Sequence, residues 1–119
     1  MNGAQSLFKS LADAGSMLGS GALVVCADDR CMLDMALNST QFFRNESCGK
    51  CVPCRVGSQK LVAMLTGWSQ GNGSAADFAL LDELADALRL TSICGLGQVV
   101  PAPIASGLPA PVMSKFVPV

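Results

Sequence analysis

Four of the six cysteines stand at spacings that suit a bound metal cluster. Cys48, Cys51 and Cys54 form a C-x2-C-x2-C run, and Cys94 lies far along the chain from it. A cubane iron-sulfur cluster needs four such thiolates, three from a short run and one from a distant position. The spacing therefore predicts that these four thiols hold a cluster and that the chain carries electrons.

The residues around the thiols suit an anionic cluster. The C-x2-C-x2-C run is too tight for a regular helix or strand, so we expect a loop in which Gly49 supplies backbone freedom. Lys50 and Arg55 place positive charge beside thiolates and sulfides, and the alternative for both is a solvated surface charge. Gly95 and Gly97 follow the remote thiol, where small residues let backbone approach a cluster.

Zinc is the main competing metal, because four cysteines also make a tetrahedral zinc site. Zinc sites usually pair their cysteines as two separate C-x2-C units, whereas three thiols in a run with one remote partner favour a cluster. Disulfides rank third, since the three cysteines of the run cannot all pair locally without strain. We expect Cys26 and Cys31, which stand in apolar sequence, to be small buried hydrophobic residues.

The composition indicates one small soluble domain. The 119 residues are half hydrophobic, which suffices for a core, and the net charge of −1 offers no basic face to nucleic acid or anionic membranes. The longest apolar runs are far shorter than a bilayer span, and the N-terminus does not resemble a signal peptide. No histidine is present, which argues against acid-base chemistry. We expect a cytoplasmic protein that is not inserted in a membrane and is not catalytic by itself.

The first 30 residues form an N-terminal segment in this interpretation. Residues 6–14 suit a brief helix, and residues 15–21 are a turn rich in glycine and serine. The apolar run over 22–27, Ala-Leu-Val-Val-Cys-Ala, predicts the one strand of the chain. Polar residues at 28–30 then interrupt the pattern.

Residues 31–119 predict a helical domain that binds the cluster. Apolar spacing indicates helices over 31–44, 55–68 and 75–90, and prolines limit the tail to a short helix between 104 and 116. The clearest apolar stripe belongs to the third of these helices and consists of Phe78, Leu81, Leu84 and Leu88. The expected fold is mostly α: a small helical bundle holding one iron-sulfur cluster, with one short strand near the N-terminus and one structural unit overall.

Three segments carry a resemblance to a known family. GSMLGSGALVV at 15–25, FFRNESCGKCVPCRVG at 42–57 and SICGLGQ at 92–98 resemble the C-terminal iron-sulfur region of the NADH-binding, flavin-carrying subunit of respiratory complex I. Related regions occur in NAD-dependent formate dehydrogenases and in hydrogenases. The resemblance implies a helical bundle in which Cys48, Cys51, Cys54 and Cys94 bind one 4Fe-4S cluster.

The chain departs from that family before residue 15. Relatives place a large flavin and nicotinamide domain ahead of this region, and no G-x-G-x-x-G element follows a strand here. We therefore expect no FMN or NAD on this chain, which is either a fragment or, as Met1 and the tail favour, a small separate subunit. It would relay single electrons between redox centres of a multi-subunit oxidoreductase, with a flavin subunit, other iron-sulfur subunits and a dehydrogenase or hydrogenase subunit as partners. The alternative is a structural or interaction module stapled by a cluster or by a four-cysteine zinc site.

Overall fold

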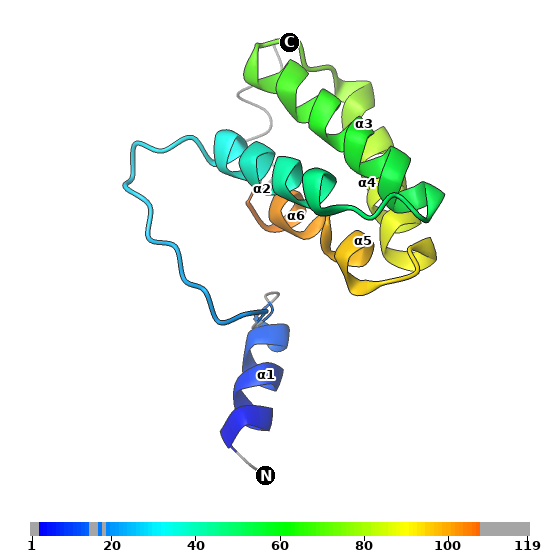
Figure 1. The fold of residues 1–119 in the computed structure, drawn as a ribbon. Coiled ribbons are helices and arrows are strands. Elements are labelled where there is room, and N and C mark those ends of the chain that lie inside the picture. The colour runs from blue at the N-terminus through cyan, green and yellow to red at the C-terminus, as the bar shows by residue number, and fades with distance from the viewer. Residues whose placement is uncertain (1–2, 15–16, 18, 108–119) are drawn as a thin grey trace. The chain divides into compact units, whose positions relative to one another are not determined.

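The computed structural model describes residues 3–14, 17 and 19–107, and these residues form helices and connecting segments without a strand (Figure 1). The helices are α1 (Gly3–Asp13), α2 (Met32–Glu46), α3 (Val52–Ser69), α4 (Ala75–Thr91), α5 (Gly95–Val99) and α6 (Ala102–Gly107). The chain divides into two compact units, which are Met1–Arg30 and Cys31–Val119. The prediction of a mostly helical protein is confirmed. No helix among the described residues is long and apolar enough to cross a membrane.

The strand predicted over 22–27 is not formed. Residues 21–27 are irregular, and Leu23, Val24 and Val25 are 88%, 71% and 88% exposed. A strand exists only where a neighbouring strand accepts and donates its backbone hydrogen bonds, and the described part of the chain offers none. The apolar run therefore has strand-forming residues but no sheet to join.

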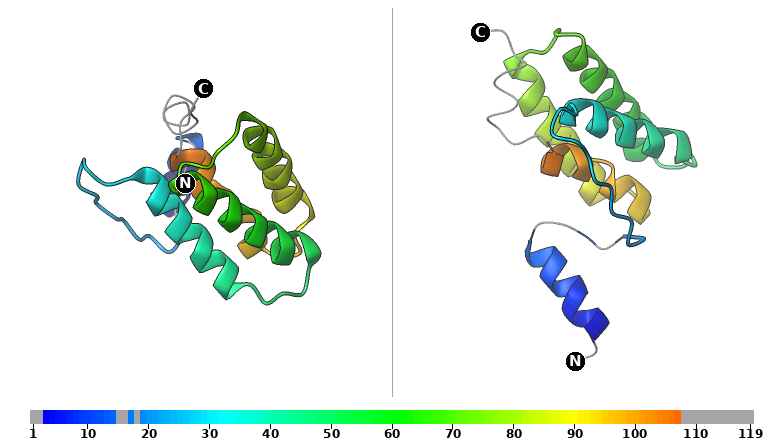
Figure 2. Two further views of the ribbon diagram at one scale, coloured as in Figure 1. Left: turned by 90° about the horizontal axis from the view of Figure 1, so that it is seen from above. Right: turned by 90° about the vertical axis from the view of Figure 1, so that its left-hand side faces the viewer.

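The second unit is a bundle in which α3 is central. Helix α2 packs against α3 and α6, α3 packs against α4 and α5, and α4 also packs against α5. Both Figure 1 and Figure 2 show the α2–α3 connection and the α4–α5 connection at the same end of this bundle. The chain thus brings the cysteine run and the remote cysteine to one end.

Apolar side chains from α2, α3, α4 and α6 fill the centre of the bundle. The buried cluster consists of Leu33, Ala36, Leu61, Leu65, Trp68, Leu81, Leu88, Val100 and Ile104. The stripe predicted on α4 is confirmed, because Leu81 and Leu88 are buried and Phe78 and Leu84 pack against the cluster. For the helix over 31–44 the apolar spacing predicts a core face made of Met32, Met35, Ala36, Phe42 and Phe43. Ala36 is buried and Phe43 packs against the cluster, but Met32 and Phe42 are exposed, and Leu33 occupies the core instead.

The turn between α3 and α4 is fixed by one carboxylate. Oδ2 of Asp77 accepts the backbone N–H of Ser74 at 2.8 Å and the indole N–H of Trp68 at 3.2 Å. These bonds hold down the pKa of Asp77, the Ser74 backbone bond contributing most and the Trp68 bond next. The capped start of α4 is therefore tied to the last turn of α3.

Candidate metal centre

The α2–α3 connection begins with a bonded turn around Ser47, directly before the first cysteine of the motif. Gly49 has φ +72°, in the left-handed region that favours glycine, and its N–H donates to Oγ of Ser47 at 3.2 Å. Nη1 of Arg55 donates to the carbonyl oxygen of Gly49 at 3.0 Å, so the same glycine is bonded on both sides. The expected backbone freedom of Gly49 is used to make this turn.

Cys54 lies inside a helix, which the sequence did not lead us to expect. Helix α3 begins at Val52 rather than near 55, with Pro53 in its first turn. A proline there already has the helical φ angle, and its missing N–H would have no partner within the helix. The first turn of α3 therefore holds the third thiol of the motif, and Cys54 is only 5% exposed.

Cys51 caps the start of α3 and is contacted by the distant connection. Hydrogen bonding from the backbone of Ile93 is the largest cause that lowers the pKa of Cys51, followed by the backbone of Cys54. Burial opposes this shift, and Arg55 adds a smaller Coulomb contribution. Because Ile93 immediately precedes Cys94, backbone from the α4–α5 connection reaches the thiol in the α2–α3 connection. The partial positive charge at the start of α3 favours a thiolate at the same position.

Gly97 closes the other side of Cys54. A Cβ atom built on Gly97 would lie 3.0 Å from Cβ of Cys54 and 2.5 Å from Oγ of Ser92, whereas one built on Gly95 would meet nothing within 4 Å. Ser92 is buried, and its hydroxyl has no hydrogen-bond partner in the part of the chain that the structure describes. Close packing at this end therefore requires glycine at 97 but not at 95.

The four predicted ligands differ in exposure. Cys48 and Cys94 are exposed, Cys51 is half-buried and Cys54 is buried. Among the described residues, no group of three or more His, Cys, Asp or Glu side chains is arranged to hold a metal ion. Ligation by all four thiols would thus require further movement of these side chains. Packing does not oppose such movement at the two exposed positions.

The two remaining cysteines lie apart from this chemistry. Cys26 and Cys31 are half-buried rather than fully buried, and Cys31 packs against the apolar cluster of the bundle. Cys31 also precedes the first residue of α2. Sequence reasoning missed Ser47 and Ser92, although Ser47 directly precedes the motif and each serine stands within two residues of a predicted ligand.

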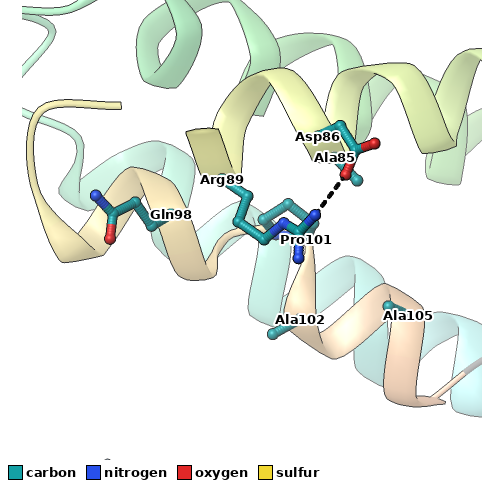
Figure 3. A pocket seen from close by; sticks show the side chains of 7 residues that line it. All are labelled: Ala85, Asp86, Arg89, Gln98, Pro101, Ala102 and Ala105. Atoms are coloured by element: carbon teal, nitrogen blue, oxygen red, sulfur yellow. Dashed lines mark hydrogen bonds and ion pairs between the residues drawn. The ribbon is translucent and has the colours of Figure 1, made fainter. Parts of the chain in front are cut away.

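A hollow of about 310 Å³ lies between α4, α5 and α6 (Figure 3). Its lining is Ala85, Asp86, Arg89, Gln98, Pro101, Ala102 and Ala105. Nη2 of Arg89 bonds to Oδ1 of Asp86 at 2.9 Å, drawn as the dashed line in Figure 3, so the basic group is already paired. None of the four predicted ligands lines this hollow.

The cysteine run and the remote cysteine thus lie at the same end of a small helical bundle. The NADH-ubiquinone oxidoreductase-F iron-sulfur binding region matches residues 34–110, and the chain belongs to this family. The match confirms the resemblance to this family and includes two of the three segments that carried it, 42–57 and 92–98.

Relatives of known identity agree with the family match. The chain is 42% identical over 99 residues to the HndC subunit of an NADP-reducing hydrogenase from Solidesulfovibrio fructosivorans, covering 83% of this chain and 20% of that protein. It is 38% identical over 101 residues to a subunit of an NADH-quinone oxidoreductase from Streptomyces coelicolor, covering 85% of this chain and 22% of that protein. The chain thus spans about a fifth of the length of these curated relatives.

A solved structure shares the fold. The crystal structure of an NAD⁺-reducing [NiFe]-hydrogenase in its H2-reduced state matches with a TM-score of 0.62 and 33% sequence identity. The match covers 64% of this chain and 13% of that chain. The bundle described above is therefore a recurring domain that also occurs inside a longer polypeptide.

Proposed function

We propose that Cys48, Cys51, Cys54 and Cys94 hold one 4Fe-4S cluster and that the chain uses it to relay single electrons. The observation that carries the proposal is the close packing of Gly97 on Cys54, since it holds the segment that bears Cys94 against the segment that bears the other three thiols. When bound, such a cluster takes up and releases one electron at a time. Four thiols are the donor set that this cluster requires.

The surroundings of the thiols fit a bound cluster better than an empty loop. Backbone N–H groups directed at Cys51 stabilise a thiolate, and hydrogen bonds to sulfur are one way in which proteins set a cluster's potential. Ser92 places a buried hydroxyl beside Cys54, and this hydroxyl has no hydrogen-bond partner among residues 3–14, 17 and 19–107. An unpaired buried polar group costs free energy unless a ligand satisfies it. The exposed Cys48 and Cys94 leave this end open to a redox centre on another chain.

The relay would operate in a multi-subunit oxidoreductase. The similar proteins are subunits of a hydrogenase and of an NADH-quinone oxidoreductase, and this chain spans about a fifth of their length. We propose that FMN and NAD bind outside these 119 residues, and that electrons enter and leave through a flavin-binding subunit, other iron-sulfur subunits or a dehydrogenase or hydrogenase subunit. Anaerobic affinity purification from the native host followed by mass spectrometry tests these partners, and purification of the chain alone would contradict them.

A structural staple, with zinc or a cluster, is the competing function. The bundle has its own apolar core from four helices, and the cysteines lie at one end of it, which favours the relay. The discriminating measurement is the iron, sulfide and zinc content of anaerobically purified chain, with electron paramagnetic resonance (EPR) after reduction. About four irons with a reversible signal support the relay. A colourless zinc protein, or iron that cannot be reduced, would support the staple.

Single cysteine variants test the ligand set. Cys94→Ala should lose the full four-iron cluster, because only one thiol is supplied by the α4–α5 connection. Cys26→Ala is the matched control, since it removes a half-buried thiol outside the motif and should keep the wild-type iron content. A complete, reducible cluster in Cys94→Ala would remove Cys94 from the ligand set.

A further inference from the structure

The hydroxyl of Ser47 lies beside the most buried thiol of the motif. Its oxygen is 3.2 Å from Sγ of Cys54, a distance at which either atom can donate. The same oxygen accepts the N–H of Gly49 at 3.2 Å. Accepting the N–H of Gly49 uses a lone pair of the Ser47 oxygen and leaves its O–H able to donate. Because a thiolate that binds metal carries no proton, Ser47 must be the donor once Cys54 binds metal.

The position of this hydroxyl is fixed from several sides. Ser47 is the C-cap residue that follows α2, and its own N–H donates to the carbonyl of Arg44 at 3.3 Å. The left-handed turn at Gly49 directs the N–H of that residue at the hydroxyl, and Arg55 bonds the carbonyl of Gly49. Cys54 is buried at the start of α3, where a hydrogen bond is stronger than in water. The donor is therefore held against its acceptor by structure that forms without the cluster.

We propose that Ser47 donates a hydrogen bond to the Cys54 thiolate of the bound cluster and thereby raises the cluster's reduction potential. The inference rests on the proposed function, because it needs a cluster on Cys54. A hydrogen bond to a ligating sulfur favours the more negative, reduced state. Ser47 is thus a positioning residue that acts through Cys54 and makes electron uptake easier.

The test compares the midpoint potential of the wild-type cluster with the potentials of three Ser47 variants and one control variant. Each full-length chain is purified anaerobically with its cluster and titrated by EPR. Ser47→Ala and Ser47→Val remove the hydroxyl, Ser47→Thr keeps it, and Thr and Val have nearly the same shape. We expect Ala and Val to lower the ratio of reduced to oxidised cluster at a fixed potential by about threefold or more, or about 28 mV at 59 mV per tenfold. The Thr variant should stay close to wild type.

Ser69→Ala is the matched control. Ser69 lies about 22 Å from Cys54 along the axis of α3, and its hydroxyl donates to the helix carbonyl of Thr66 at 2.9 Å. An unchanged potential in Ser47→Ala would overturn the proposal, and so would a shift in Ser47→Thr or in Ser69→Ala as large as the shift in Ser47→Ala. Loss of the cluster from both hydroxyl-free variants, with Ser47→Thr fully loaded, would overturn it in favour of a role in cluster assembly. If the wild-type chain holds no reducible cluster, both the electron relay and the role of Ser47 are overturned. If the wild-type chain holds one and the Ser47 variants do not shift its potential, only the role of Ser47 is overturned.

Discussion

Gly97 packs directly against Cys54: a Cβ atom on Gly97 would lie 3.0 Å from the Cβ atom of Cys54. Gly97 and Cys94 belong to the same short stretch of chain, so this contact sets how closely α5 approaches the first turn of α3. Any side chain at 97 would separate the two segments that carry the predicted ligands.

Gly97→Ala should therefore destabilise the bundle. The added methyl group meets the buried Ser92 and Cys54, and overpacking of this kind costs about 1–3 kcal/mol. Urea unfolding followed by circular dichroism measures the change in the free energy of unfolding. Gly95→Ala is the control, because its methyl group enters open space in the same short helix. Equal stability of the two variants would contradict the close packing at Gly97.

Variants of Arg55 and Lys50 can distinguish whether positive charge or a hydrogen bond slows the loss of iron from the site. Arg55 bonds the carbonyl of Gly49 at 3.0 Å, whereas Lys50 is exposed and has no hydrogen bond or ion pair among the described residues. Arg55→Gln should speed the loss of iron to a chelator about fivefold, since a hydrogen bond contributes about 1 kcal/mol.

Lys50→Gln removes the same charge and should release iron at the wild-type rate. If both variants lose iron equally fast, positive charge alone protects the site and the bond to Gly49 is unimportant. The sequence interpretation, in which both residues tune charge, would then be the better one.

Asp77 should make stability depend on pH at the acid end. Hydrogen bonds from the Ser74 backbone and from Trp68 hold the pKa of Asp77 below its ordinary value of 3.8. Because the pKa of Asp77 is lower in the folded chain than in the unfolded chain, its ionised form stabilises the fold. This stabilisation is fully present when the pH is above the pKa of the unfolded chain, and it is lost as the pH falls through the pKa of the folded chain. Asp77→Asn should be less stable than wild type at neutral pH, and the difference should narrow below pH 3.8.

Urea unfolding of the cluster-free chain at neutral and acid pH, read from the fluorescence of its one tryptophan, measures this difference. Asp82→Asn, which removes an exposed carboxylate from the same helix, is the control. A difference between wild type and Asp77→Asn that stays constant over the whole pH range would contradict the bonded role of Asp77.

Gly73 should not tolerate a side chain beside Trp68. A Cβ atom on Gly73 would lie 2.8 Å from Cδ1 of Trp68. The buried ring of Trp68 also packs against the ring of Phe78, with 4.8 Å between the ring centroids. Gly73→Ala should shift the tryptophan emission and lower stability by about 1–3 kcal/mol. Gly67→Ala has room in α3 and should be neutral or stabilising. An unchanged emission spectrum in Gly73→Ala would contradict the packing of this turn.

The sequence by itself identified the family, the four candidate thiols and most of the helices. The cysteine spacing is a local pattern, and the stripe on α4 reflects a helical period that any amphipathic helix shows. Such features depend only on residues that are close in sequence. They can therefore be recognised without knowing which helices pack against each other.

Only the tertiary structure decided which residues meet. It buried Leu33 rather than Met32, left the run at 22–27 without a sheet, and placed Cys54 inside α3. It also brought Ser47 to Cys54 and Gly97 to Ser92. These relationships depend on how α2, α3 and α5 approach one another in space, and that approach is set by packing between distant segments, which sequence spacing does not encode.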